Sequence, residues 1–174
     1  CVLFPNRLRD VLMALAGTDL FRASWSSGVE QELLRTIPRE RPDIKVEQVQ
    51  RILELMRGHL PGALVTGYEG LINGIELPDL DDRHIVAAAI RAQAQVIVTA
   101  NLRDFPAQAL CQYDIEAIHP DEFILDLLDL SPAIVVTMLK RVRRRWQSPP
   151  HDPDEFIEAL RACGLPMTAT ALAE

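Results

Sequence analysis

In the stretch LPDLDDRHIVAAAI (residues 77–90), three carboxylates stand directly before an apolar, alanine-rich helix pattern. Asp79, Asp81 and Asp82 repel one another at this spacing, and packing against a core would add a desolvation cost. Acidic side chains favour a helix N-terminus, so capping alone accounts for one of them. Three of them require a compensating positive charge.

The segments on either side of this stretch alternate between strand and helix patterns. Residues 96–99 (VIVT) form a β-branched apolar run that is typical of a buried parallel strand. Further strand patterns cover residues 1–4, 20–25, 63–68 and 115–118, and helix patterns cover 7–16, 26–37, 45–60 and 83–93. Ser26 is expected to cap the second helix and Pro38 to end it. This alternation predicts an α/β fold with a central, mostly parallel sheet flanked by helices.

After His119 the pattern changes to helices only. Pro120, Pro132 and Pro153 each suit the first position of a helix, and we predict helices near 120–130, 132–146 and 153–163. Ser131 and Asp152 are expected to cap the last two. The stretch QSPPHDPDE (147–155) is the predicted flexible joint. We therefore expect an α/β domain over residues 1–120 and a C-terminal helical extension over 121–174.

Composition limits the class of protein. The chain has 174 residues, 48% of them hydrophobic, and no apolar run approaches the roughly 20 residues that a membrane span needs. Its three cysteines are far apart and lack CxxC spacing, which argues for the reducing cytoplasm and against a disulfide framework or a zinc site. We expect a cytoplasmic protein that does not bind a membrane.

Charge is unevenly distributed. The net charge is −7, but residues 1–130 carry 12 basic and 20 acidic side chains, and residues 131–174 carry 6 and 5. Five of those six lie in KRVRRR, residues 140–145. The acidic body argues against a protein that coats duplex nucleic acid. It favours a site that attracts cations, with one basic cluster for a polyanion.

Three polar stretches are expected to meet at the carboxyl ends of the strands, where ligands of parallel sheets collect. They comprise Asp79, Asp81 and Asp82, then Asn101 and Asp104 after the strand 96–99, and Glu30 and Glu32 in the helix that follows Trp25. Clustered oxygen ligands without histidine or cysteine favour Mg²⁺ or Mn²⁺. His84 follows the acids directly, but capping or packing is the more common role of a histidine in a first helical turn.

The stretches CVLFPNRLRDVLMALA (1–16), SWSSGVEQELL (24–34) and LPDLDDRHIVAAAIRAQAQVIVTANLRDF (77–105) resemble PIN-domain ribonucleases in order and spacing, especially the VapC-type toxins of toxin–antitoxin systems. The resemblance covers about residues 1–119. It implies a PIN-like fold and Mg²⁺- or Mn²⁺-dependent cleavage of RNA. The implied partners are a small antitoxin protein and, commonly, a second copy of the chain. By motif position the catalytic residues are Glu32, Asp82, Asp104 and Asn101, and the metal ligands are Asp82, Asp104, Glu32 and Asp79.

Two features depart from the family pattern. The first aspartate of the family would stand two residues before Cys1, so we expect an apolar stretch and an aspartate upstream in the native chain. On a helical wheel, Glu30 lies nearer the centre of the apolar face than Glu32 does. Family position therefore favours Glu32, whereas burial favours Glu30 as the inward-pointing acid.

The basic cluster and the activity itself have alternative interpretations. Arg141, Arg144 and Arg145 are predicted to bind RNA phosphates, although a solvated helix face is equally compatible with the pattern. The chain could also be a nucleic-acid-binding or regulatory protein that keeps the fold with impaired catalysis. A metal-dependent phosphatase is a further alternative, but the sequence has no loop for gripping a nucleotide or a sugar.

Overall fold

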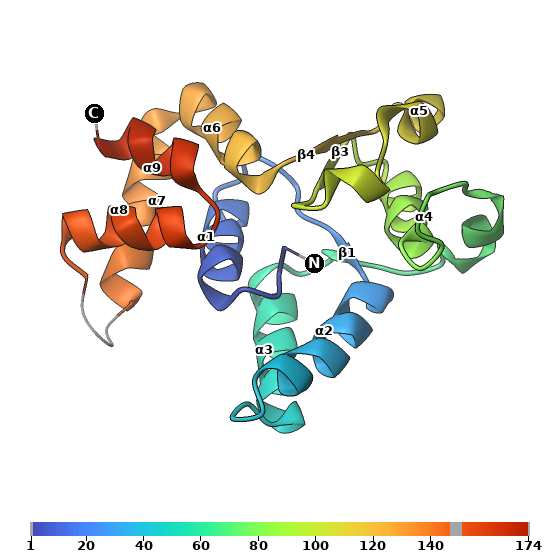
Figure 1. Cartoon of the computed structure of the whole chain (residues 1–174), viewed down its shortest axis with the longest axis horizontal. Helices are drawn as coiled ribbons and strands as arrows, with labels where there is room; N and C mark the ends of the chain where they lie inside the picture. The colour runs from blue at the N-terminus through green and yellow to red at the C-terminus, as the bar shows by residue number, and fades with distance from the viewer. Residues whose placement is uncertain (1, 147–150, 174) are drawn as a thin grey trace. The chain divides into compact units, whose positions relative to one another are not determined.

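The computed structural model describes residues 2–146 and 151–173, which divide into two compact units (Figure 1). The first unit comprises residues 22–118. The second comprises residues 2–21 together with residues 119–173. Each unit has its own hydrophobic core, so each is described by itself.

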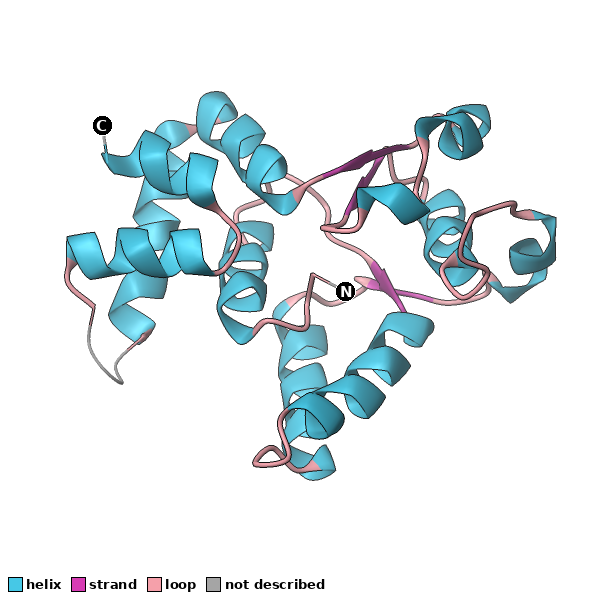
Figure 2. Cartoon of the chain, viewed as in Figure 1, coloured by secondary structure: helices cyan, strands magenta, loops and turns pink. Residues whose placement is uncertain are grey.

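The first unit is a mostly helical α/β structure (Figure 2). Its strands are short: β1 (Trp25–Ser26), β2 (Leu64–Val65), β3 (Val96–Val98) and β4 (Glu116–Ile118). Its α-helices are α2 (Ser27–Glu40), α3 (Val46–His59), α4 (Arg83–Ala92) and α5 (Ala107–Leu110). Three 3-10 turns complete it: η1 (Glu69–Gly74), η2 (Leu102–Asp104) and η3 (Cys111–Tyr113).

The strands pair in parallel, as predicted, but in two separate pairs rather than one central sheet. β1 pairs with β2 and β3 pairs with β4, each with two or three residues a strand. Residues 2–4 form a turn and a bend, not the strand expected there, and Cys1 lies outside the described residues. Because the strands are this short, helices supply most of the packing surface of the unit.

Helix α2 begins as predicted and ends later. The Ser26 side chain accepts a hydrogen bond from the backbone N–H of Val29, which confirms its capping role. The expected end at Pro38 is wrong, because the helix continues to Glu40 and closes through a bond from the Arg41 N–H to the Ile37 carbonyl. Proline has a helical φ, and near a C-terminus the loss of one hydrogen bond is tolerated.

Helix α4 is central to the packing of the first unit. Its residues 86–89 (VAAA) are buried, and the helix packs against η1, β1, β2 and β3. Alanine side chains let neighbouring backbones approach closely without filling space. The N-terminus of α4 and the loop after β3 are thereby held at fixed positions, and both carry the predicted acidic residues.

The second unit is entirely helical within the described residues. It contains α1 (Asn6–Ala16), α6 (Pro120–Leu130), α7 (Pro132–Arg145), α8 (Pro153–Ala162) and α9 (Pro166–Ala173). The three predicted C-terminal helices are confirmed, but α9 was not predicted. Gly164, at a φ of +90°, ends α8, and Pro166 begins a further helix whose small residues have no amphipathic pattern.

Helix α1 belongs to this helical unit. Its buried face, which includes Leu8, Val11 and Leu15, shares one core with Ile124 of α6 and Val135 of α7. Helix α1 therefore belongs to the same compact unit as the C-terminal helices, although the predicted boundaries place it in the α/β domain. The domain boundaries 1–120 and 121–174 stay predictions.

The helix caps of this unit are partly as expected. Asp152 and Glu155 form a capping box at the start of α8, whereas the side chain of Ser131 makes no capping bond to α7. Of the predicted joint 147–155, residues 147–150 lie outside the described residues. Within the described ranges, no helix is both long and apolar enough to cross a membrane.

A buried carboxylate fastens α9 to α6. Asp121 is 3% exposed and accepts hydrogen bonds from the backbone N–H groups of Met167 (2.7 Å) and Thr168 (2.8 Å). These N–H groups belong to the first turn of α9 and have no partner within that helix. One side chain therefore caps a helix that lies 47 residues further along the chain.

We predict that Asp121→Ala lowers the free energy of unfolding by about 1–3 kcal/mol, because two buried N–H groups lose their acceptor. Chemical unfolding followed by circular dichroism measures the change. Asp129→Ala, at an exposed position of the same helix, is the matched control and should change stability by less than about 0.5 kcal/mol. Equal effects of the two substitutions would show that the contact contributes nothing.

Candidate metal centre

Three of the predicted aspartates converge in the first unit. Asp79 lies in the loop before α4, Asp82 is the residue at the N-cap of α4, and Asp104 lies in η2 just after β3. One carboxylate oxygen from each lies within 4.8 Å of the others. Residues that are 25 positions apart in the sequence thus form one cluster, and its oxygen atoms suit a hard divalent cation.

Helix capping does not account for this cluster. The side chain of Asp82 makes no capping hydrogen bond, although the residue occupies the N-cap position. Asp79 accepts a bond from the backbone N–H of Asp81 (2.9 Å), which tightens the loop. Asp81 is exposed and is not part of the cluster. Asp79 therefore has a local structural role in the loop, whereas the N-cap position of Asp82 does not explain its carboxylate.

The cluster is short of positive charge. Burial raises the pKa of Asp82, and the charges of Asp79, Asp104 and Glu32 raise it further, while His84 opposes the shift. Among the described residues, no Lys or Arg forms an ion pair with the three aspartates. Asn101 donates its side-chain amide to Asp104. A divalent cation fits these residues because it would supply the charge that they lack.

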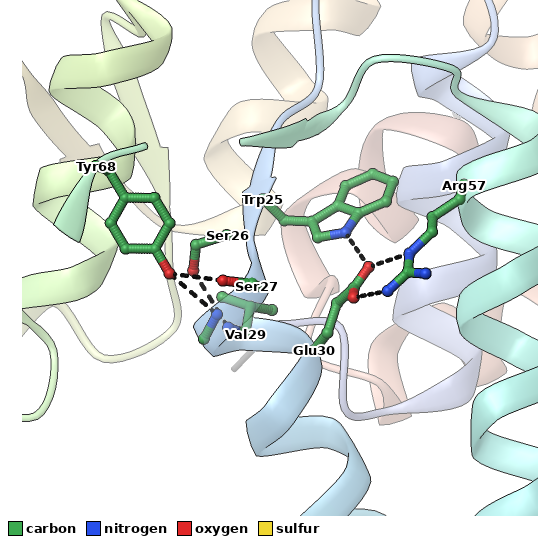
Figure 3. A network of polar contacts seen from close by, with 8 residues as sticks. Trp25, Ser26, Ser27, Val29, Glu30, Arg57 and Tyr68 are labelled. Carbon is green, nitrogen blue, oxygen red and sulfur yellow. Dashed lines mark hydrogen bonds and ion pairs between the residues drawn. The ribbon is translucent and has the colours of Figure 1, made fainter. Parts of the chain in front are cut away.

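Glu30 is the buried acid, as the helical wheel predicts, and its charge is already compensated. It is 4% exposed and accepts hydrogen bonds from Trp25 Nε1 (3.0 Å) and Arg57 Nε (2.9 Å), with a second bond from Arg57 (Figure 3). Burial alone would raise the pKa of Glu30, but the bonds from Arg57 and Trp25 outweigh it and lower the pKa. Glu30 is therefore a structural partner of Arg57.

Glu32 points to a different neighbour. Its Oε1 lies 3.0 Å from His84 Nε2, and this hydrogen bond lowers the pKa of Glu32 against the opposing effect of burial. Glu32 is not one of the three acids whose oxygen atoms lie within 4.8 Å of one another. It is near enough for its charge to raise the pKa of Asp82. Of the two glutamates, Glu32 is the one associated with the cluster.

Ser26 and Gly28 were not predicted as site residues, and Ser26 was predicted only as a helix cap. Both lie next to the ring of His84, and His84 therefore has a more specific environment than the capping or packing role expected for it. The bond between Ser26 and His84 spans 58 residues, so no local pattern could have indicated it.

Arg141, Arg144 and Arg145 lie in α7 of the helical unit, where all three are exposed.

Comparison with known proteins supports the resemblance to VapC-type toxins. Over 101 residues, the chain is 41% identical to a Mycobacterium tuberculosis (strain ATCC 25618 / H37Rv) protein named "Putative ribonuclease VapC50". Residues 120–174 match the family described as the VapC50 C-terminal domain. The chain is a homologue of VapC50. The resemblance to VapC-type toxins, which are PIN-domain ribonucleases, is confirmed.

The match to VapC50 takes in 58% of the chain and 59% of the length of that relative. No solved structure is significantly similar to the chain. The relationship to VapC50 therefore rests on sequence, and the carboxylate cluster is an independent structural observation in the same chain.

The raised pKa of Asp82 predicts how a neutral replacement changes stability without metal. A raised pKa means that folding favours the protonated carboxyl, and this contribution is lost as pH rises through the pKa of the folded state. Asp82→Asn stays neutral at every pH. In EDTA, the variant should melt about 1–4 °C above the wild-type protein near pH 7, and the difference should vanish below about pH 3, where the carboxyl is protonated in both the folded and the unfolded state.

Thermal unfolding of both proteins across this pH range tests the prediction. Asp81→Asn is the matched control, since it removes the adjacent charge outside the cluster and should shift the melting temperature little. A wild-type protein that is more stable than Asp82→Asn near pH 7 in EDTA would contradict the account of the cluster.

Proposed function

We propose that the chain is a metal-dependent endoribonuclease, the toxin component of a VapBC-like toxin–antitoxin module. The observation that carries the proposal is the cluster of Asp79, Asp82 and Asp104 in a homologue of VapC50. We also propose that residues 1–120 form a PIN-like nuclease domain and residues 121–174 a helical extension.

The chemistry of the cluster supports Mg²⁺ or Mn²⁺ as the cofactor. Asp79, Asp82 and Asp104 would hold the ion through carboxylate oxygens, with Glu32 and Asn101 in support. A divalent cation at such a site makes water a better nucleophile and stabilises the charge of the attacked phosphate. The three aspartates would then keep the ion next to the scissile phosphodiester.

A side-chain nucleophile is poorly supported. Ser26, His84 and Glu32 form a serine–histidine–glutamate series that looks like a catalytic triad in composition. However, Ser26 is 1% exposed and its Oγ already accepts the N–H of Val29. A phosphate in solvent cannot reach this hydroxyl, so water is the better-supported nucleophile.

The proposed partners follow from the family relationship. RNA is the proposed substrate, a small antitoxin protein the proposed inhibitor, and a second copy of the chain a further partner. Arg141, Arg144 and Arg145 are the proposed RNA-binding residues, because these residues are exposed and a guanidinium group can bind phosphate oxygens in a bidentate manner.

In the full-length protein, Asp82→Asn and Asp104→Asn should each lower the rate of Mg²⁺-dependent RNA cleavage by at least about a hundredfold. Each removes a charged ligand at the place where the cation would be held. Cleavage of defined RNAs with Mg²⁺ and with EDTA measures the effect. Asp81→Asn, next to the cluster, is the matched control and should retain activity.

Each alternative outcome has a definite meaning. Wild-type cleavage by both variants would rule out the site. Metal binding by the wild-type protein without RNA cleavage would favour a regulatory nucleic-acid-binding protein, and hydrolysis of small phosphate esters instead of RNA would favour a phosphatase.

Charge reversal of Arg141, Arg144 and Arg145 to glutamate should weaken RNA binding more at low salt than at high salt. Each lost phosphate contact reduces the slope of log affinity against log salt by about 0.7 for a single strand, so the total reduction is up to about 2. Affinity measured over a salt series gives this slope.

Reversal of three other exposed arginines, Arg39, Arg51 and Arg161, changes the net charge equally and is the control. The exposed ion pairs that these residues make contribute little to stability. If both triple variants have the same salt slope, the effect is one of net charge and the cluster at Arg141–Arg145 is not an RNA-binding site.

A further inference from the structure

A continuous series of hydrogen bonds joins the first turn of α2 to α4. The backbone N–H of Val29 donates to Ser26 Oγ (3.2 Å), Ser26 Oγ lies 2.9 Å from His84 Nδ1, and His84 Nε2 lies 3.0 Å from Glu32 Oε1. Both ring nitrogens of His84 are therefore engaged, one on each side. The series ends at the glutamate that is associated with the aspartate cluster.

The chemistry of the groups sets the direction of each bond. The Glu32 carboxylate only accepts, so His84 Nε2 carries the hydrogen and donates it. In the neutral ring Nδ1 is then an acceptor and takes the hydroxyl hydrogen of Ser26. The Ser26 oxygen in turn accepts the Val29 N–H. Every donor has one acceptor, which fixes the tautomer and the orientation of the ring.

The position of the ring depends on the absence of a side chain at Gly28. A Cβ atom at that position would lie 2.5 Å from His84 Nδ1 and 2.8 Å from His84 Cε1, closer than real contacts allow. On another side, the buried Tyr68 hydroxyl accepts the Gly28 N–H (3.2 Å) and bonds to Ser27 Oγ (3.0 Å), as Figure 3 shows in part. The first turn of α2 is thus fixed by Tyr68 and His84.

We propose that His84 is a positioning residue, which Ser26 and Gly28 seat against α2 so that its Nε2–H holds the Glu32 carboxylate in place beside Asp82. The inference rests on the proposed metal-dependent function. A glutamate side chain rotates about several bonds, and a fixed donor at Oε1 selects one arrangement while leaving Oε2 for a second partner. Partners of this kind commonly change metal affinity by about 10–100-fold when removed.

Three variants of the full-length protein test the proposal through the affinity for Mn²⁺, which electron paramagnetic resonance of the unbound ion measures. His84→Ala removes the donor, and Gly28→Ala displaces the ring while keeping every hydrogen-bonding group. Both should raise the Kd for Mn²⁺ about tenfold. His84→Gln retains an amide N–H for Glu32 and should recover part of the loss.

Gly58→Ala is the matched control for Gly28→Ala. Both replace a helical glycine by a better helix former, but a Cβ atom at Gly58 meets nothing within 4 Å. Its Kd for Mn²⁺ should equal that of the wild type. The melting temperature in EDTA is recorded for every variant, since a purely structural histidine would lower that temperature and leave the affinity of the folded protein unchanged.

Asp82→Asn separates the two proposals. If Asp82→Asn weakens Mn²⁺ binding but folded His84→Ala binds like the wild type, the positioning role is overturned and the metal site stands. If Asp82→Asn also binds Mn²⁺ like the wild type, the metal site itself is wrong and both proposals fall. Should Gly28→Ala not fold, the comparison of His84→Ala with His84→Gln decides, and equal affinities of these two would overturn the proposal.

Discussion

Mutual repulsion among Asp79, Asp82 and Asp104 is the constraint on which the rest of the first unit depends. Three carboxylates whose oxygen atoms lie within 4.8 Å of one another separate unless the backbone holds them. The buried alanine face of α4, the tight loop at Asp79 and the turn η2 after β3 provide that support. The unit thus keeps an unbalanced negative charge in one place, which a bound cation would neutralise.

The acids of α2 have different roles because they face different neighbours. Glu30 is neutralised by Arg57 and anchored by Trp25, so its burial contributes to packing without leaving an unpaired charge. Glu32, two residues later, turns toward His84 and the aspartates. One helix therefore links the core of the unit to the candidate metal centre.

Local signals in the sequence predicted the helices well. The helical periodicity of residues 45–60, the Ser26 cap and the proline starts of α6, α7 and α8 all depend on residues close in the chain. The convergence of the aspartates was also expected, because strand ends collect polar side chains. The extent of the strands was overestimated, since apolar β-branched runs do not by themselves indicate how many backbone groups find a partner.

Other features depend on contacts that no local pattern encodes. Arg57 reaches Glu30 across 27 residues, and His84 reaches Ser26 across 58. Asp121 caps α9 from a different helix, and α9 itself has no apolar periodicity. The choice between Glu30 and Glu32 stayed open in the sequence for the same reason: both lie on one helix, and only their tertiary partners differ.

The most direct test of the metal centre is a crystal structure of the full-length protein, determined from crystals soaked in Mn²⁺ with the anomalous signal of the ion recorded. The account predicts one strong anomalous peak within about 2.0–2.4 Å of carboxylate oxygens of Asp79, Asp82 and Asp104. An ordered crystal with no Mn²⁺ peak at these aspartates, or with the peak at another group of residues, would contradict it.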